Sequence, residues 1–121
     1  MTLAYLGDAV LEIMVREKVM ETGVTDVGRL NKMAKTFVKA TEQSAALENI
    51  LPILDEEELG IFKRGRNAKG NTPKSASTVE YRRATGLEAL FAFLYMKGRT
   101  DRLKQLFETA YGDRFESLLN I

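Results

Sequence analysis

Apolar residues recur at helical spacing along almost the whole chain, and this feature constrains the fold more than any other. The first segment shows it in Leu3, Leu6, Val10, Ile13 and Met14. Intervals of three and four residues place such side chains on one face of an α-helix. No segment shows the sustained alternation of apolar and polar residues that is typical of a strand. The sequence therefore predicts an all-α fold of six or seven helices.

Capping and breaking residues predict where these helices begin and end. The first helix should run to about residue 21 and stop at Gly23, and Pro52 should mark the end of the third. The expected starts are Thr25 or Asp26, Thr41, Asp55 with the acids 56–58 behind it, Thr78, Thr100, and Asp113 for a short last helix. Residues 65–77 should form the one long loop. Neither a linker nor a repeat is visible, so residues 1–121 are expected to form a single domain.

Two residue types are absent, and their absence limits the chemistry. The chain has no cysteine and no histidine, which excludes disulfides, thiolate nucleophiles, Ser-His systems and the commonest transition-metal ligands. Catalysis would have to use carboxylates, Lys, Arg, Tyr, hydroxyls or a metal held by oxygen. No signal-peptide pattern is visible, and the longest apolar run, at 87–96, is too short to span a bilayer. We expect a soluble cytoplasmic protein without a membrane partner.

Positive charge is concentrated in one segment, KRGRNAKGNTPKSASTVEYRR, at 63–83. Its 21 residues hold seven basic side chains and one acid, whereas the other hundred residues hold 11 basic and 16 acidic ones. Such a segment suits contact with a phosphate backbone. The candidate nucleic-acid-binding residues are Lys63, Arg64, Arg66, Lys69, Lys74 and Arg82.

Other interpretations of this segment are weaker. GRNAKGNT at 65–72 approaches a phosphate-binding P-loop, but Asn71 stands where that motif needs lysine, and a helix rather than a strand is expected before it. Lys74 and Ser75 could form a Ser-Lys pair only if a rigid scaffold held them. An ordinary solvated charged loop is the plainest alternative.

Two carboxylates stand inside apolar helical patterns. Asp8 lies in LAYLGDAVLE, residues 3–12, and Glu88 lies in ATGLEALFAFLY, residues 84–95. A buried carboxylate is costly unless it is paired, hydrogen-bonded or bound to a cation. A glycine close to each would allow another backbone or a ligand to approach. If the two helices pack together, oxygen ligands for Mg2+ would meet there. The plainer alternatives are a salt bridge between helices and a helix face that is solvated. Glu12 is a further possible ligand, with an ion pair to Arg16 as its plainer role.

These motifs resemble those of the ribonuclease III catalytic domain. LAYLGDAVLE is similar to that family's signature, whose aspartate binds Mg2+, and TGLEALFAFLY is similar to its second acidic motif, whose glutamate completes the site. KRGRNAKGNTPK followed by VEYRRATGLEAL resembles the Mini-ribonuclease III branch, which has the catalytic domain and no double-stranded-RNA-binding domain. Ordinary members carry two more acids, where this chain has Ala4 and Thr85. The Mini branch is similar in lacking them.

The resemblance implies a Mg2+-dependent endoribonuclease that cuts double-stranded RNA and leaves 5′-phosphate and 3′-hydroxyl ends. Asp8 and Glu88 would be both the catalytic residues and the metal ligands. It further implies a homodimer that acts on the precursor of large-subunit (23S) ribosomal RNA, with a ribosomal protein as a candidate further partner. Two alternatives are a non-catalytic RNA-binding or ribosome-assembly protein on the same fold, and a generic helical interaction domain that binds no RNA.

Overall fold

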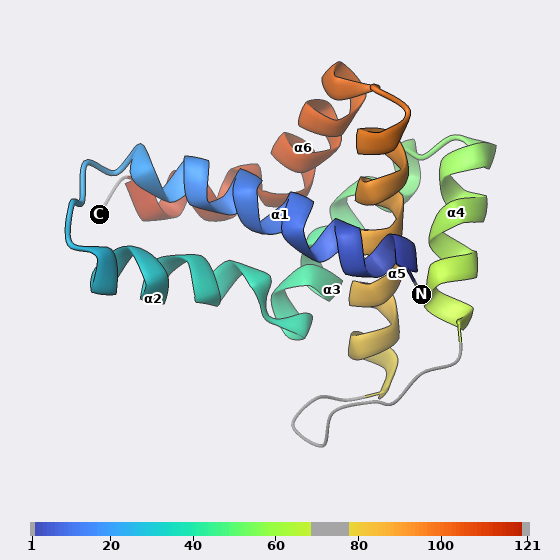
Figure 1. Ribbon diagram of the computed structural model, residues 1–121, viewed down its shortest axis with the longest axis horizontal. Coiled ribbons are helices and arrows are strands. Elements are labelled where there is room, and N and C mark those ends of the chain that lie inside the picture. Colours follow the sequence, from blue (N-terminus) through green and yellow to red (C-terminus); the bar gives the residue numbers. More distant parts are fainter. Residues whose placement is uncertain (1, 69–77, 120–121) are drawn as a thin grey trace.

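Six α-helices and one 3-10 turn make up a computed structural model that describes residues 2–68 and 78–119 (Figure 1). The elements are α1 Thr2–Met20, α2 Val27–Val38, α3 Ala40–Ile50, the turn η1 Leu51–Ile53, α4 Glu56–Asn67, α5 Thr78–Met96 and α6 Thr100–Leu119. The described residues contain no strand. The predicted all-α fold class and helix number are therefore confirmed.

Helix α5 is the centre of the structure. It packs most extensively against α1 and α4 and also contacts α3 and α6. In Figure 1 it stands upright, with α1 crossing it and α4 beside it. Its apolar residues lie on all sides, and Leu87, Leu90, Phe91 and Leu94 are fully buried. A helix that is apolar all round is stable only when neighbours cover it, which explains this central position.

Most helix ends follow the capping residues in the sequence. The side chain of Asp26 accepts a hydrogen bond from the Gly28 amide at the start of α2, and Asp55 forms a reciprocal capping box with Glu58 at the start of α4. Gly23 follows α1 with φ +82°, a conformation that favours glycine. The expected cap at Thr41 is wrong. Helix α3 follows α2 after the single residue Lys39, which is its N-cap and makes no side-chain capping bond.

Two predicted boundaries are corrected by the structure. Helix α4 continues to Asn67, so the first residues of the expected loop at 65–77 are helical. No separate helix begins at Asp113, because α6 runs through it to Leu119. The physical reason is the apolar spacing of Phe107, Tyr111 and Phe115, all buried, which keeps one face of α6 in the core past Asp113.

The main core cluster has members from all six helices, and a smaller second cluster lies between α1, α4 and α5. Leu11, Val15 and Val19 of α1 are buried, whereas Ile13, which was predicted to share a stripe with the buried Val10, is 60% exposed. The apolar residues of α1 therefore form two stripes, and sequence spacing does not show which one faces the core. At the other end of the core, Phe37 packs against Phe115 with ring centroids 4.3 Å apart.

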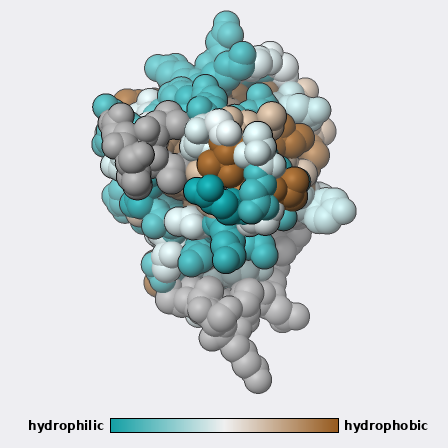
Figure 2. All heavy atoms as spheres, turned by 90° about the vertical axis from the view of Figure 1, so that its left-hand side faces the viewer, coloured by the Kyte–Doolittle hydropathy of each residue, from teal (hydrophilic) through white to brown (hydrophobic). Residues whose placement is uncertain are grey.

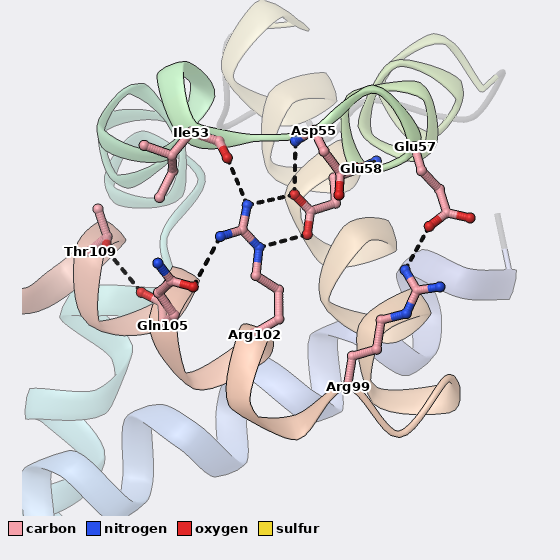
Figure 3. Close-up of polar contacts among 8 residues, drawn as sticks. All are labelled: Ile53, Asp55, Glu57, Glu58, Arg99, Arg102, Gln105 and Thr109. Atoms are coloured by element: carbon pink, nitrogen blue, oxygen red, sulfur yellow. Dashed lines mark hydrogen bonds and ion pairs between the residues drawn. The ribbon is translucent and has the colours of Figure 1, made fainter.

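A buried ion pair fixes the start of α4 to α6 (Figure 3). The Arg102 guanidinium donates to both carboxylate oxygens of Glu58, at 2.8 and 2.7 Å, and to the Ile53 carbonyl at 2.7 Å. These bonds hold the pKa of Glu58 below its ordinary value, although burial opposes them. Arg99 pairs with Glu57 at 2.6 Å nearby. Because an unpaired buried carboxylate is strongly destabilising, this cluster sets the position of α4, whose far end carries the basic residues.

The surface near the α1–α2 connection is largely hydrophilic, with a small hydrophobic area (Figure 2). Among the described residues, no helix combines the length and apolar character needed to cross a membrane.

Candidate functional site

The site begins where the backbones of α1 and α5 touch. A Cβ atom placed on Gly7 would lie 1.7 Å from the Glu88 carbonyl oxygen and 2.8 Å from the Glu88 Cα. Only a residue without a side chain permits this approach. The contact puts Asp8, the next residue of α1, beside Glu88 of α5.

The two predicted carboxylates do meet. Asp8 is exposed, which corrects the expectation that it is buried and agrees with the alternative of a solvated helix face, and Glu88 is partly buried. Burial, the charge of Asp8 and a hydrogen bond with the Asp8 side chain raise the pKa of Glu88 to about 8, while a hydrogen bond with the Gln43 side chain opposes the rise. No described Lys or Arg forms an ion pair with either acid. The salt-bridge interpretation of these acids therefore finds no support among the described residues.

Glu88 should make the stability of the metal-free protein depend on pH. Between pH 4.5, the ordinary pKa of this group, and about 8, the unfolded chain releases the proton while the folded protein keeps it. Stability is therefore lost as pH rises through this window, by a few kcal/mol at most. Glu88→Gln should remove this loss, so its melting temperature should exceed that of the wild type more at pH 8.5 than at pH 5 in a chelating buffer. Equal differences at both pH values would contradict the raised pKa.

Gln43 is a functional candidate that sequence reasoning missed. It lies on α3, is 3% exposed and contacts Glu88 through its side-chain amide. A sequence signal existed, because position 43 shares the inward face with Leu47 and Ile50 at intervals of four and seven. A glutamine on such a face needs polar partners, and here they are the Val38 carbonyl, which accepts from Nε2 at 2.9 Å, and the Glu88 carboxylate.

The remaining acids do not join the pair. Glu12 forms the expected ion pair with Arg16 at 3.0 Å. Within residues 2–68 and 78–119, no three acidic side chains gather closely enough to hold a metal ion together. Ala4 and Thr85 stand where ordinary members of the family named above have further acids. Ala4 is buried against Ile61 and Ala89. The Thr85 hydroxyl donates to the Tyr81 carbonyl of its own helix.

The donor set of this site fits one hard cation. Carboxylate oxygens are the ligands that Mg2+ prefers, and one or two carboxylates with water and phosphate oxygens are a usual Mg2+ environment. A cation between Asp8 and Glu88 would offset the repulsion that raises the pKa of Glu88. Asp8 and Glu88 would hold it.

The basic residues flank the same part of α5. A Cβ on Gly65 of α4 would lie 2.7 Å from the Ala89 Cβ and 3.0 Å from the Gly86 Cα, so the last turns of α4 press against the α5 turn that carries Glu88. Lys63 and Arg64 are exposed on these turns, and the Arg66 guanidinium lies 5.5 Å from the Phe62 ring centroid. The placement of these cations suits a polyanion that also reaches the carboxylates.

Among the remaining cations, Arg82 is exposed on α5. Lys69 and Lys74, also predicted to bind RNA, lie outside the described residues. Arg83 from the same cationic segment has a structural role, because it donates to Ser44 at 2.8 Å and pairs with Glu48, tying α5 to α3.

Comparison with known proteins gives a consistent set of similarities. Residues 1–99 match the family model of the Ribonuclease III domain. Mini-ribonuclease 3 of Symbiobacterium thermophilum is 46% identical over 111 residues, which cover 91% of this chain and 85% of that protein. Mini-ribonuclease 3 of Desulfitobacterium hafniense is 48% identical over 108 residues, which cover 89% and 69%. A crystal structure of a Fusobacterium nucleatum protein has a TM-score of 0.81 and 35% identity, covering 88% of this chain and 87% of that one.

Proposed function

The chain belongs to the ribonuclease III family and is an endoribonuclease, and from this premise we propose that it hydrolyses double-stranded RNA with Mg2+ held by Asp8 and Glu88. The observation that carries the site assignment is the meeting of these two carboxylates across the Gly7 contact. The proposed products are 5′-phosphate and 3′-hydroxyl ends.

The proposed mechanism divides the work between the cation and the protein. The positive charge of bound Mg2+ would activate the attacking water and offset the negative charge that develops on the phosphate. Asp8 and Glu88 fix the place of that charge, and Glu88 does so from a partly buried position on the central helix. Water and phosphate oxygens would complete the coordination. Neither cysteine nor histidine is needed for this chemistry, in agreement with the composition.

The basic residues Lys63, Arg64, Arg66 and Arg82, together with Lys69 and Lys74, are proposed to bind the phosphates of the duplex. Recognition would then depend mainly on A-form shape, because the deep groove of duplex RNA hides the base edges. Such contacts are electrostatic, and binding should weaken steeply as salt rises.

Replacing Lys63 and Arg64 with alanine tests this role. The double variant should bind duplex RNA more weakly, and the slope of log K against log salt should fall by about 1 for each phosphate that the variant no longer binds. Fluorescence anisotropy at several salt concentrations measures both quantities. Replacing the exposed Lys32 and Lys35 of α2 is the matched control, since it removes the same charge from another helix. Equal losses of affinity in the two variants would show that only net charge matters.

We also propose a homodimer formed through the outward stripe of α1. Tyr5 is 86% exposed and Ile13 is 60% exposed. Beside this stripe lies an apolar groove of about 570 Å3, lined by α1, by Tyr95 and by the first half of α6. Tyr5 lies one turn before Asp8, so a second copy docked on this stripe would place its own site nearby. Light scattering should give the mass of two chains, and a monomer at micromolar concentration would contradict the dimer.

Incubation of the protein with a duplex and with a single strand of the same sequence, with and without Mg2+, tests the central proposal. Cleavage of the duplex alone, and only with Mg2+, is expected. A duplex that is bound and never cut would support the non-catalytic alternative. The proposed natural substrate is the 23S ribosomal RNA precursor in the cytoplasm, with a ribosomal protein as the proposed further partner. Uncut precursor ends should accumulate in cells without this protein, and normal ends would contradict the assignment.

A further inference from the structure

Gln43 differs from the other buried polar side chains of the described structure. The buried polar or charged residues of the described structure are Gln43, Glu58 and Thr85. Glu58 is paired with Arg102, and Thr85 bonds to its own helix, so both are explained by local structure. Gln43 instead connects α3 to the α2 terminus and to Glu88, and its Oε1 is buried without a hydrogen-bond donor among the described residues.

The amide of Gln43 has one orientation that its surroundings permit. Nε2 donates to the Val38 carbonyl at 2.9 Å, and the side chain also hydrogen bonds with the Glu88 carboxylate. The Val38 carbonyl only accepts, and Glu88 accepts in the ionised form that a bound cation would require, so the two N–H groups of Nε2 can serve both. A turned amide would direct Oε1 at the Val38 carbonyl oxygen, which cannot donate. The Val38 anchor therefore keeps a donor facing Glu88.

This arrangement is unfavourable for stability by itself. A buried oxygen without a donor costs about 1–3 kcal/mol, and an apolar residue of similar shape would leave no such atom. The unpaired oxygen belongs to an amide that contacts the Glu88 carboxylate, which lies on the central helix beside Asp8. A role in holding that carboxylate explains why an amide stands there.

We propose that Gln43 is a positioning residue for Glu88: anchored on the Val38 carbonyl, its amide holds the Glu88 carboxylate toward Asp8 and the cation that the two acids bind. This inference rests on the proposed function of the Asp8–Glu88 pair. Gln43 itself touches neither the RNA nor the cation in this proposal. It acts through Glu88 alone.

Gln43→Met tests the role because methionine keeps the length of the side chain and removes its hydrogen bonds. We expect kcat to fall about 10- to 100-fold, the usual effect of losing a partner that orients a metal ligand. RNA affinity should stay the same, because Gln43 is buried and is not itself one of the exposed basic residues proposed to bind phosphates. Mn2+ binding, measured by electron paramagnetic resonance without RNA, should weaken over the same range. The melting temperature should change little, since loss of the unpaired Oε1 offsets loss of the hydrogen bond to the Val38 carbonyl.

Gln105→Met on α6 is the matched control and should keep wild-type kcat and Mn2+ binding, because Gln105 is exposed and contacts Arg102 rather than the site. Gln43→Leu, branched like the amide, repeats the test if the methionine variant does not fold.

The outcomes separate this inference from the proposed function. A folded Gln43 variant with wild-type kcat and Mn2+ binding would overturn the positioning role while the cleavage site stands. Loss of activity in proportion to loss of folded protein would also overturn it, since that result marks a structural residue. If the wild type neither binds Mn2+ nor cleaves a duplex, the proposed function itself is wrong, and the role of Gln43 falls with it.

Discussion

Asp8→Asn is expected to lower the rate of duplex cleavage by about 10³-fold or more while RNA binding stays near the wild-type value. The substitution keeps the shape of the side chain and removes the negative charge that a cation requires. Asp8 is exposed, so its replacement disturbs no packing, and a folding defect should not contribute. Single-turnover cleavage with excess enzyme measures the loss of the chemical step, and anisotropy measures binding.

Glu12→Gln is the control for Asp8→Asn, because it makes the same chemical change one turn later on the same helix. Glu12 pairs with Arg16 and does not join the carboxylate pair, so its loss should cost only the small energy of a surface ion pair. Near wild-type activity is expected. Activity that survives Asp8→Asn would show that the cation binds elsewhere. A strong loss of activity in Glu12→Gln would indicate that Glu12 is a third ligand.

The sequence predicted helices better than it predicted which of their faces lie inside. Helical spacing and caps such as Asp26 and Asp55 act locally, so a single sequence shows them. Ile13 was placed on one stripe with Val10, although Val10 is buried and Ile13 is exposed, because two apolar stripes on one helix look alike without their neighbours. The expected break at Asp113 failed for a related reason: packing of Tyr111 and Phe115 outweighs a local capping preference.

The candidate site was predictable in its charged members and not in its supporting ones. Asp8 and Glu88 were conspicuous because acids inside apolar patterns are costly, and the structure does bring them together. The sequence could not show that Gln43 contacts Glu88, because that contact depends on how α3 packs against α5. It indicated that a backbone could approach Gly7, without showing how close the approach is.

Among the glycines that the structure describes, Gly7 has the largest expected effect on substitution, because the Glu88 backbone approaches it so closely. An added Cβ would overlap the Glu88 carbonyl, an atom of helix backbone that cannot turn aside as a flexible side chain would. This overlap can be relieved only if α1 and α5 move apart. Because the two helices carry one carboxylate each, the same movement that strains the core also pulls the site apart.

Gly7→Ala should therefore destabilise the fold by about 3 kcal/mol or more, at the upper end of overpacking effects, despite the better helix propensity of alanine. The melting temperature should fall by roughly 10 °C or more. At a temperature where the variant is still folded, cleavage should drop about 10²-fold, because displacements near 1 Å at a reacting centre cost that much. Gly112→Ala in α6, where nothing lies within 4 Å of the new Cβ, should instead be neutral or stabilising by about 1 kcal/mol. Calorimetry and single-turnover cleavage on both variants separate the two glycines, and a Gly7→Ala protein as stable and active as Gly112→Ala would mean that α1 and α5 are not in backbone contact.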